Sequence, residues 1–394
     1  MKVVPASLLI IGLAMLPASV PAQLPETVAP SLSAQDQAPV PKEIPVGLLV
    51  DLSTGQTLFS RESQRRFVPA SVTKVMTAYT AFKLIDEGKL PLDRRFQYTQ
   101  ELEDEWFAEG SNMFLKAGER PTIAQLLLGV TTVSGNDASV ALGVAATGSL
   151  EQWVGLMNAN ARELGMQDTH FGSPNGFPDG GLTFSTARDL ALLGEATTTR
   201  FPGLYKRFFG HRHLTWRDIT QANHDPVTGR VDGADGLKTG FTNEAGYTFL
   251  GSAKRGGRRL IMVLAGSPSA RVRDKAARDL LEWGFAEFEQ RTVLPGGTKV
   301  GNALVQDGEK GSVALRTPDE VVAALPRGRD GALTMAIIYR GPVEAPIATG
   351  DRIARLKVQI DGEPAMDVPL EAAEDIPLAG PFQRIRNAIT HWLG

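Results

Sequence analysis

The chain has 394 residues, of which 42% are hydrophobic and 22% charged, and its formal net charge is −3. This composition is typical of a globular protein, and the length allows two or three domains. Because there is no cysteine, disulfides, thiol nucleophiles and thiolate metal sites are excluded. Without a basic region, nucleic acid is not expected as a partner.

The N-terminus has the pattern of a secretory signal peptide. Lys2 precedes an apolar run from Ala6 to Leu16, and small residues then suit cleavage after Ala22. The apolar run is too short to span a membrane as a helix, and an uncleaved N-terminal anchor is the alternative. We therefore expect residues 1–22 to direct export, and residues 23–44, rich in Pro, Ala and Gln, to form a linker.

Residues 45–288 are predicted to form one domain in which strands flank a helical block. A hairpin is expected first, then helices and loops to about residue 199, and then three strands and a helix. These elements are predicted at 47–52, 56–60, 234–239, 246–253, 259–265 and 274–288. The five strands can form one antiparallel sheet with the helical lobe inserted, which is an α+β fold with a cleft between sheet and lobe.

The C-terminal part of the chain has a different pattern. Short apolar runs separated by Gly, Pro and Asp predict a small all-β domain at residues 289–376. Residues 377–394 place Phe382, Ile389 and Trp392 at helical spacing, which predicts an amphipathic helix that anchors the chain to a membrane surface. A terminal helix packed on the protein is the alternative.

The stretch Ser71-Val72-Thr73-Lys74 is the first candidate for chemistry. A helix is expected from Ala70 to Glu87, and apolar residues around its circumference indicate that it is buried. Ser71 and Lys74 then share one face, as a nucleophile and a base whose pKa burial would lower. A match to Ser-x-x-Lys alone is expected about once by chance in a chain of this length.

Two further motifs make the pattern specific. Ser134-Gly135-Asn136 and Lys238-Thr239-Gly240 follow in the order found in penicillin-binding proteins and class A β-lactamases, although Gly135 stands where the described motif has Asp. A second Ser-x-Asn, Ser173-Pro174-Asn175, is a turn expected at most to line the cleft.

With these motifs the chain resembles the low-molecular-mass penicillin-binding proteins that are serine-type D-alanyl-D-alanine carboxypeptidases, peptidase family S11. The resemblance covers about residues 45–394 and includes residues 185–189, 236–242, 245–247 and 283–285. It implies a β-lactamase-like and penicillin-binding-protein-like fold, and removal of the terminal D-alanine from peptidoglycan stem pentapeptides. It also implies covalent inhibition by β-lactam antibiotics, no cofactor, and a periplasmic location on the outer face of the cytoplasmic membrane.

The side chains suggest a division of labour for the acyl transfer. Ser71 would attack the peptide carbonyl, Lys74 would take its proton, and Ser134 would relay a proton to the leaving amine. Backbone N–H groups of Ser71 and Phe241 would form the oxyanion hole.

A second group of residues is expected to hold the substrate. Asn136 offers an amide to the substrate backbone, and Lys238, Thr239 and Gly240 form the strand motif beside it. Lys238 and Thr239 suit the carboxylate of a D-alanine leaving group. The resemblance adds Arg273 to the carboxylate site.

Three other functions remain open from the sequence. A serine β-lactamase needs a deacylating residue, and no Glu-x-x-Asn is evident, although Glu109, Glu151 and Glu163 are candidates. A D,D-endopeptidase would share the motifs. A β-lactam sensor or a wall scaffold would be non-enzymatic. No metal site is expected, since His211 and His213 lack a third ligand and are predicted to be exposed strand residues.

Overall fold

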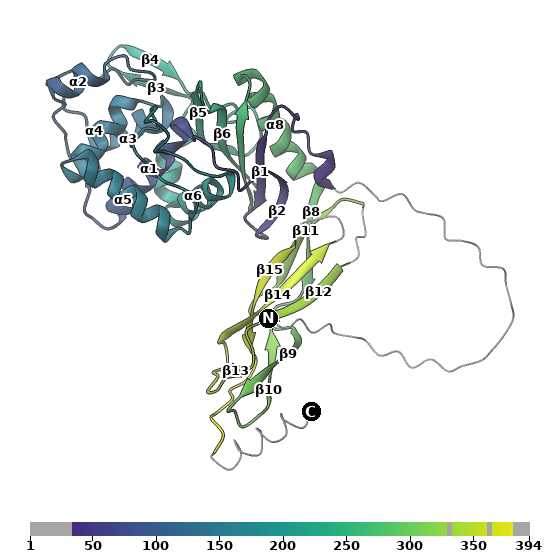
Figure 1. The fold of residues 1–394 in the computed structure, drawn as a ribbon. Helices are drawn as coiled ribbons and strands as arrows, with labels where there is room; N and C mark the ends of the chain where they lie inside the picture. Colours follow the sequence, from purple (N-terminus) through teal and green to yellow (C-terminus); the bar gives the residue numbers. More distant parts are fainter. Residues whose placement is uncertain (1–33, 329–332, 361–364, 381–394) are drawn as a thin grey trace, which may run out of the picture. The chain divides into compact units, whose positions relative to one another are not determined.

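The computed structural model describes residues 34–328, 333–360 and 365–380. By its contacts the chain separates into two compact units, one of residues 38–287 and a second that takes in the chain from Phe288 onward. Figure 1 shows both units with their elements labelled.

A five-stranded antiparallel sheet forms the framework of the first unit. Its strand order is β2-β1-β7-β6-β5, so the first and last parts of the unit build one sheet. The strands are β1 (Val46–Asp51), β2 (Gln56–Arg61), β5 (Ala234–Thr242), β6 (Gly246–Arg255) and β7 (Arg258–Ser267). This is the sheet that the sequence predicts, with β5 at one edge.

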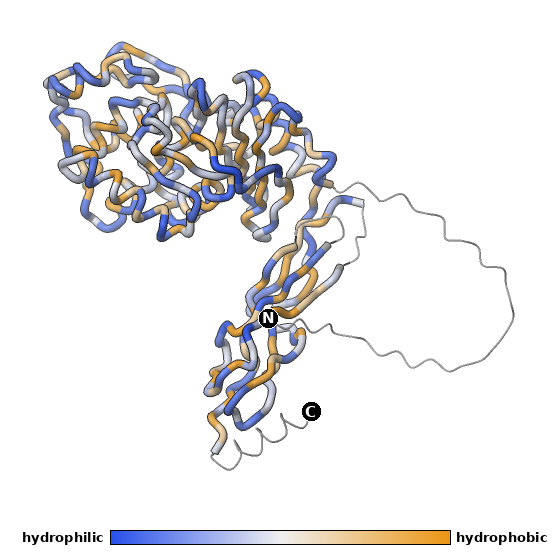
Figure 2. The backbone as a smooth tube through the Cα atoms, viewed as in Figure 1, coloured by the Kyte–Doolittle hydropathy of each residue, from blue (hydrophilic) through white to orange (hydrophobic). Residues whose placement is uncertain are grey.

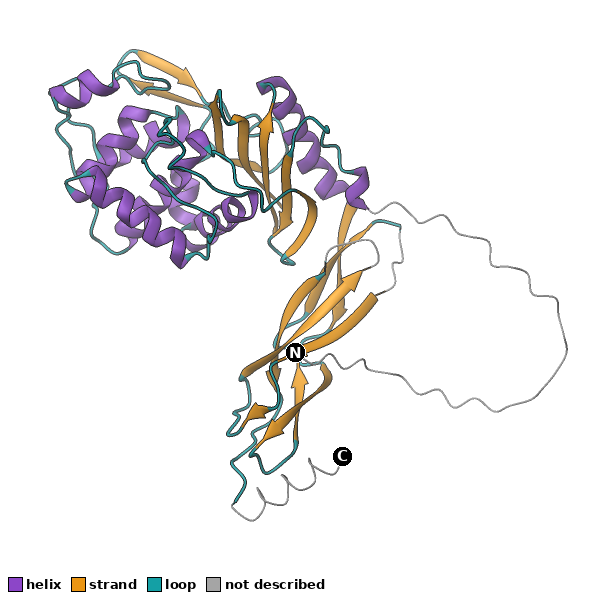
Figure 3. Ribbon diagram, in the orientation of Figure 1, coloured by secondary structure: helices purple, strands orange, loops and turns teal. Residues whose placement is uncertain are grey.

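Helices cover both faces of this sheet, as Figure 3 shows. The helices α6 (Ala187–Arg200) and α8 (Ala270–Glu287) both pack against β6 and β7. Burial on both faces explains why residues 260–265 are a continuous apolar run with no exposed surface.

The helical lobe lies between β2 and β5 in the sequence. At its centre is α1 (Lys74–Asp86), which contacts the helices α3, α4, α5 and α6. The remaining elements of this lobe are η2 (Ala70–Thr73), α2 (Gln100–Trp106), α3 (Ile123–Thr132), α4 (Asn136–Thr147), α5 (Leu150–Glu163), α7 (Pro202–Phe208), β3 (His213–Trp216) and β4 (Ile219–Ala222). The core of the lobe is therefore built around the helix that carries Lys74.

The central helix differs from the sequence prediction at its start. The expected continuous helix from Ala70 is a 3₁₀ turn, η2, followed by α1 from Lys74. Ala70 has a φ of +50°, a backbone conformation that non-glycine residues seldom adopt and that an α-helix does not contain, so a regular α-helix cannot begin at Ala70. Ser71 and Lys74 consequently lie on either side of the junction between two helix types.

Other local predictions also need correction. The sequence favours a helix from Ala138 capped by Asp137, but α4 begins at Asn136. The Asp137 carboxylate accepts the N–H groups of Met113 and Leu115 as well as that of Ala138. The acidic run at residues 101–105 forms most of α2, capped by Thr99, and α7 and the β3–β4 hairpin were not predicted. Asp137 thus holds a distant loop, which sequence spacing does not reveal.

The second unit is all-β, as predicted. Its main sheet has six strands in the order β12-β14-β15-β10-β9-β13, and β11 pairs with β8. The strands are β8 (Phe288–Leu294), β9 (Lys299–Gln306), β10 (Ser312–Arg316), β11 (Val321–Pro326), β12 (Leu333–Tyr339), β13 (Val343–Glu344), β14 (Arg352–Ile360) and β15 (Met366–Ala372). Hydrophobic and hydrophilic positions are mixed along these strands, as Figure 2 shows, and they alternate most regularly along β14. The unit has a buried core of its own.

The structure differs from the predicted segment boundaries near both ends of the chain. The linker expected at residues 23–44 includes a described 3₁₀ helix, η1 (Ala34–Gln37), and a packed segment in which Val40 and Ile44 are buried. The Arg61 guanidinium donates to the carbonyls of Val40, Pro41 and Ile44, which fixes that segment to β2. Residues 1–22, the predicted signal peptide, lie outside the described residues.

At the C-terminus, residues 377–380 are not helical. Leu378 forms a β-bridge with Gly308, and Ala379 donates to the carbonyl of Asp307. The rest of the predicted amphipathic helix, 381–394, lies outside the described residues. Within the described ranges, no helix combines the length and hydropathy needed to cross a membrane.

Candidate active site

Ser71 and Lys74 form a close pair at the junction of η2 and α1. The Nζ atom of Lys74 lies 2.9 Å from the Oγ atom of Ser71, and Lys74 is 1% exposed. The same Nζ lies 2.8 Å from Oδ1 of Asn136 and 2.8 Å from the carbonyl oxygen of Asn175. The amine is therefore fixed against the nucleophile by two carbonyl groups from other parts of the lobe.

The electrostatic surroundings favour the neutral form of Lys74. Burial is the main cause that holds the pKa of its amine well below the usual value, and the positive charge of Lys238 adds to it. Asp137 acts in the opposite direction. A neutral lysine beside a serine hydroxyl has the protonation state that a general base requires.

The loop between α3 and α4 supplies the second motif. Ser134 is buried and has a φ of +63°, so the loop holds it in a strained left-handed conformation, as Ala70 is held beside Ser71. Asn136 is the first residue of α4, and both the oxygen and the nitrogen of its side-chain amide form hydrogen bonds within the protein. Its Oδ1 accepts from Lys74, and its Nδ2 donates to the carbonyl of Glu109.

The third motif lies on β5, at the edge of the sheet next to η2. Gly240 passes so close to η2 that a Cβ atom would lie 2.6 Å from the Pro69 carbonyl oxygen and 3.3 Å from the Ser71 nitrogen. Glycine is needed here to bring the strand beside the nucleophile. Because β5 is an edge strand, its outer main-chain groups have no strand partner and are suited to bind an extended peptide.

Lys238 precedes this glycine and is almost completely buried. Burial, and then the neighbouring Arg273, lower its pKa to about 7, although Asp225 raises it. Its Nζ donates to the carbonyl of Thr239 at 2.9 Å. Lys238 thus places a titratable positive charge on β5, next to the cleft-lining Thr239.

A contact that sequence reasoning missed comes from the loop containing Asn175 and Gly176. This is the Ser-x-Asn motif expected only to line the cleft, yet its backbone carbonyl holds Lys74. Gly176 has a φ of +69°, and a Cβ atom there would lie 1.9 Å from the Ala70 carbonyl oxygen. The turn signature of Asn-Gly was visible in the sequence, but a main-chain contact has no side-chain signature.

These parts surround a cleft of about 500 Å³. It is lined by Ser71, Gly110, Ser111, Ser134, Asn136, Gly176, Phe177, Pro178, His224, Thr239, Gly240, Phe241, Thr242, Asn243, Tyr247, Ala270 and Arg273. Seven of the nine predicted site residues therefore line this cleft. The other two contact lining residues, since Lys74 is hydrogen-bonded to Ser71 and Lys238 to Thr239. Lys238 is beside Thr239 in the same strand.

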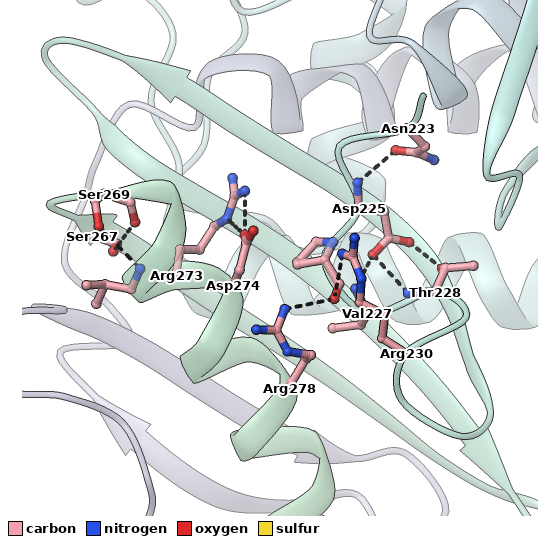
Figure 4. Close-up of polar contacts among 12 residues, drawn as sticks. Asn223, Asp225, Val227, Thr228, Arg230, Ser267, Ser269, Arg273, Asp274 and Arg278 are labelled. Carbon is pink, nitrogen blue, oxygen red and sulfur yellow. Dashed lines mark hydrogen bonds and ion pairs between the residues drawn. The ribbon is translucent and has the colours of Figure 1, made fainter. Parts of the chain in front are cut away.

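Arg273 lies in the first turn of α8, which begins at Ala270 rather than at the predicted Asp274. Ser269 caps the helix by accepting the Val272 N–H, and the Asp274 carboxylate accepts from Nε and Nη2 of Arg273, as Figure 4 shows. Arg273 is 5% exposed and lies over the ring of Tyr247. Its guanidinium is thereby preorganised at the cleft, where it suits a carboxylate.

Phe241, whose backbone was predicted to contribute to the oxyanion hole, has a half-exposed side chain. Its ring stacks on that of Tyr247 with centroids 4.3 Å apart. His211 and His213 are not among the cleft-lining residues. Across the described ranges, no group of three or more His, Asp or Glu side chains is placed to hold a metal ion.

Comparison with known proteins identifies the family. A family model described as D-alanyl-D-alanine carboxypeptidase matches residues 38–269, and one described as the C-terminal domain of penicillin-binding protein 5 matches residues 288–378. The chain belongs to the D-alanyl-D-alanine carboxypeptidase family. The predicted recognition, α+β fold, enzyme class and carboxypeptidase function are thereby confirmed.

Individual relatives of this family match along most of the chain. D-alanyl-D-alanine carboxypeptidase DacD of Salmonella typhimurium is 34% identical over 92% of this chain and 95% of its own length. Penicillin-binding protein 5 of Haemophilus influenzae has a TM-score of 0.72 at 29% identity, covering 89% of this chain and 99% of that one. Penicillin-binding protein D2 of Listeria monocytogenes, solved with ampicillin, has a TM-score of 0.56 at 28% identity, covering 62% of this chain and 98% of that one.

Proposed function

We propose that this chain removes the terminal D-alanine from peptidoglycan stem pentapeptides through an acyl-enzyme on Ser71. The observation that carries the proposal is the 2.9 Å separation of Lys74 Nζ and Ser71 Oγ at a cleft where all three motifs meet. Family membership supports the carboxypeptidase activity, and the geometry supports the residue roles.

Acylation follows from the geometry at Ser71. The Ser71 oxygen attacks the carbonyl carbon of the penultimate D-alanine while its proton passes to the neutral amine of Lys74. The peptide C–N bond then breaks, and the leaving amine receives a proton, which Ser134 relays from the lysine. The products of this step are free D-alanine and a Ser71 ester of the shortened peptide.

Two sets of groups stabilise this step. The backbone N–H groups of Ser71 and Phe241 form the oxyanion hole, and one such donor is worth about 2.7–4 kcal/mol. Thr239, Lys238 and Arg273 bind the free carboxylate of the leaving D-alanine. The substrate backbone lies along the edge of β5. Asn136 holds Lys74 through Oδ1, and its Nδ2 donates one hydrogen to the Glu109 carbonyl, which leaves a second hydrogen for the substrate backbone.

The cleft favours a carboxypeptidase over a β-lactamase. No aspartate or glutamate is among the cleft-lining residues of the described chain. Glu163, one of the three candidates, is bound to Lys83 away from the cleft, and Glu109 contributes its backbone carbonyl to Asn136. Without a positioned carboxylate, a β-lactam acyl-enzyme hydrolyses slowly, so we propose that β-lactams inhibit this protein covalently.

We further propose that the chain is exported and lies in the periplasm, on the outer face of the cytoplasmic membrane. The apolar stretch within residues 1–22 and the helical spacing of apolar residues in 381–394 support this location. Deleting residues 381–394 should move the mature protein from the membrane pellet to the soluble periplasmic fraction. Unchanged pelleting would contradict the proposed anchor.

Incubation with a purified pentapeptide muropeptide tests the proposed activity. Mass spectrometry should show the loss of one alanine residue from the peptide with the wild-type protein and no change with Ser71→Ala. Cleavage of a cross-linked dimer without loss of terminal alanine would instead identify an endopeptidase, and an unchanged muropeptide would refute the proposed activity.

A further inference from the structure

The cleft contains a histidine that none of the three motifs includes. His224 lies between β4 and β5 and lines the same cavity as Ser71, Thr239 and Arg273. Its side chain is exposed at the cleft wall, and it is the only histidine among the described lining residues. An exposed imidazole at this position can contact whatever binds beside Arg273.

The loop on both sides of His224 is rigidly built. Asn223 Oδ1 accepts the N–H of Asp225 at 2.9 Å, and Asn223 Nδ2 donates to the carbonyl of His211. The Asp225 carboxylate accepts the N–H of Val227 at 2.8 Å as well as the Thr228 hydroxyl (Figure 4). The two neighbours of His224 are therefore fixed, which fixes its own backbone.

The same loop is tied to the helix that carries Arg273. Arg278 of α8 donates to the carbonyl of Pro226 at 3.3 Å, and Arg230 donates to that carbonyl at 3.4 Å. Figure 4 shows Arg278 reaching from the helix to the loop and Arg273 held by Asp274 on the same helix. His224 and Arg273 thus project from two elements that are bound to each other.

The charges around His224 are mainly positive. Lys238 and Arg273 act on it as cations, and Asp274 is the opposing anion. Asp274 is already bound to Arg273, and the adjacent Asp225 accepts hydrogen bonds within its own turn. Desolvation first, and then Lys238 and Arg273, lower the pKa of the imidazole below its usual value. Both nearby carboxylates are thus already engaged by other groups, and a bound anion could pair with the imidazole.

We propose that His224 binds the C-terminal carboxylate of the substrate together with Lys238 and Arg273, and that it takes up a proton when the substrate binds. This inference rests on the proposed function, because a carboxypeptidase substrate supplies such an anion. A carboxylate next to the imidazole favours its charged form, which raises the pKa of His224 in the complex. Substrate should then bind more tightly as the pH falls, until His224 is protonated in the free protein as well.

Steady-state kinetics with a peptide ending in D-Ala-D-Ala provide the first test. Between about pH 7.5 and pH 5.5, around the usual imidazole pKa, KM of the wild type should fall. His224→Gln should raise KM about tenfold at the acidic end and flatten the profile, as expected for loss of a charge-assisted hydrogen bond. His224→Arg should keep KM low throughout, and kcat should change less than about threefold in both variants.

His213→Gln is the matched control, because His213 is an exposed histidine on β3 outside the cleft. The His213→Gln variant should keep the wild-type dependence of KM on pH. If KM rises above about pH 7 and the rise persists in His224→Arg, it is assigned to deprotonation of Lys238, whose pKa is about 7. A wild-type KM profile in His224→Gln would overturn the proposal.

An equilibrium measurement separates this inference from catalysis. In the Ser71→Ala protein, NMR titration of the five histidines, with His224→Gln for assignment, should show the His224 pKa rising when the carboxylate peptide is added. The same peptide with a C-terminal amide should leave it unchanged. If the pKa of His224 rises with both peptides, or with neither, the proposed role of His224 is contradicted. Absence of D-alanine release by the wild type would instead refute the proposed function.

Discussion

At the scale of the residue, the three neighbours of Lys74 suit it to the proposed role of a base. A neutral amine has two hydrogens and one lone pair. The two hydrogens can be donated to the carbonyl oxygens of Asn136 and Asn175, which leaves the lone pair directed to the hydroxyl of Ser71. The geometry is thus suited to the neutral amine, which burial and Lys238 also favour.

This arrangement predicts the pH dependence of acylation. The active form is the neutral amine, so the rate should fall as the pH drops through the lowered pKa of Lys74, well below the free-lysine value of about 10.4. Asn136→Asp places a carboxylate about where Oδ1 accepts from Nζ, and this should raise that pKa. The acidic limb should move up by about one to two pH units, which is roughly a 10- to 100-fold loss of rate at pH values below the wild-type limb and a smaller loss above it.

Stopped-flow acylation by a chromogenic β-lactam, followed across pH, measures this limb. Asn136→Ala serves as the control for loss of the contact without an added charge, and its limb should move less. A limb that stays in place or moves to lower pH in Asn136→Asp would show that Lys74 is not the titrating base.

At the scale of the element, the site depends on the close approach of β5 to η2. Gly240 permits this approach, since any Cβ atom would collide with the Pro69 carbonyl. Gly240→Ala should therefore push the strand away from Ser71 and reduce the second-order rate of acylation about 100-fold, the cost of a displacement of roughly 1 Å.

The matched control for this substitution is Gly155→Ala. Gly155 lies in α5, where a Cβ atom would meet nothing within 4 Å, and it does not require a positive φ. This variant should acylate at the wild-type rate and be slightly more stable to heat, because alanine is favoured over glycine in a helix. Equal rates for the two variants would mean that the approach of β5 is not needed.

The same elements show what the sequence could predict and what it could not. The three motifs and the five strands were predictable because they are carried by side-chain type and by apolar runs. The contact of the Asn175 carbonyl with Lys74 was not, since a backbone carbonyl is common to all residues. The positive φ of Ala70 and Ser134 was equally hidden, because neither residue favours that conformation and the tertiary fold imposes it.

At the scale of the whole molecule, the groups proposed to be catalytic all belong to the unit of residues 38–287. The first unit has its own five-stranded sheet and its own buried core. The second unit has its own sheets and buried core. The two units are therefore expected to fold independently.

A protein ending at Glu287, where α8 ends, should test this expectation. It should unfold cooperatively and release D-alanine from a soluble pentapeptide at a rate within about twofold of the full chain, since the active-site contacts described above lie within it. Calorimetry and a D-alanine assay measure both properties. A well-folded fragment without activity would show that the second unit contributes to the site.

The most direct test of the central claim is the position of the covalent bond. After incubation with benzylpenicillin, intact-mass analysis should show one added penicilloyl group, and peptide mapping should place it on the peptide containing Ser71. The Ser71→Ala protein should gain no mass. An adduct on another residue, or an adduct that persists in Ser71→Ala, would contradict the assignment of Ser71 as the nucleophile.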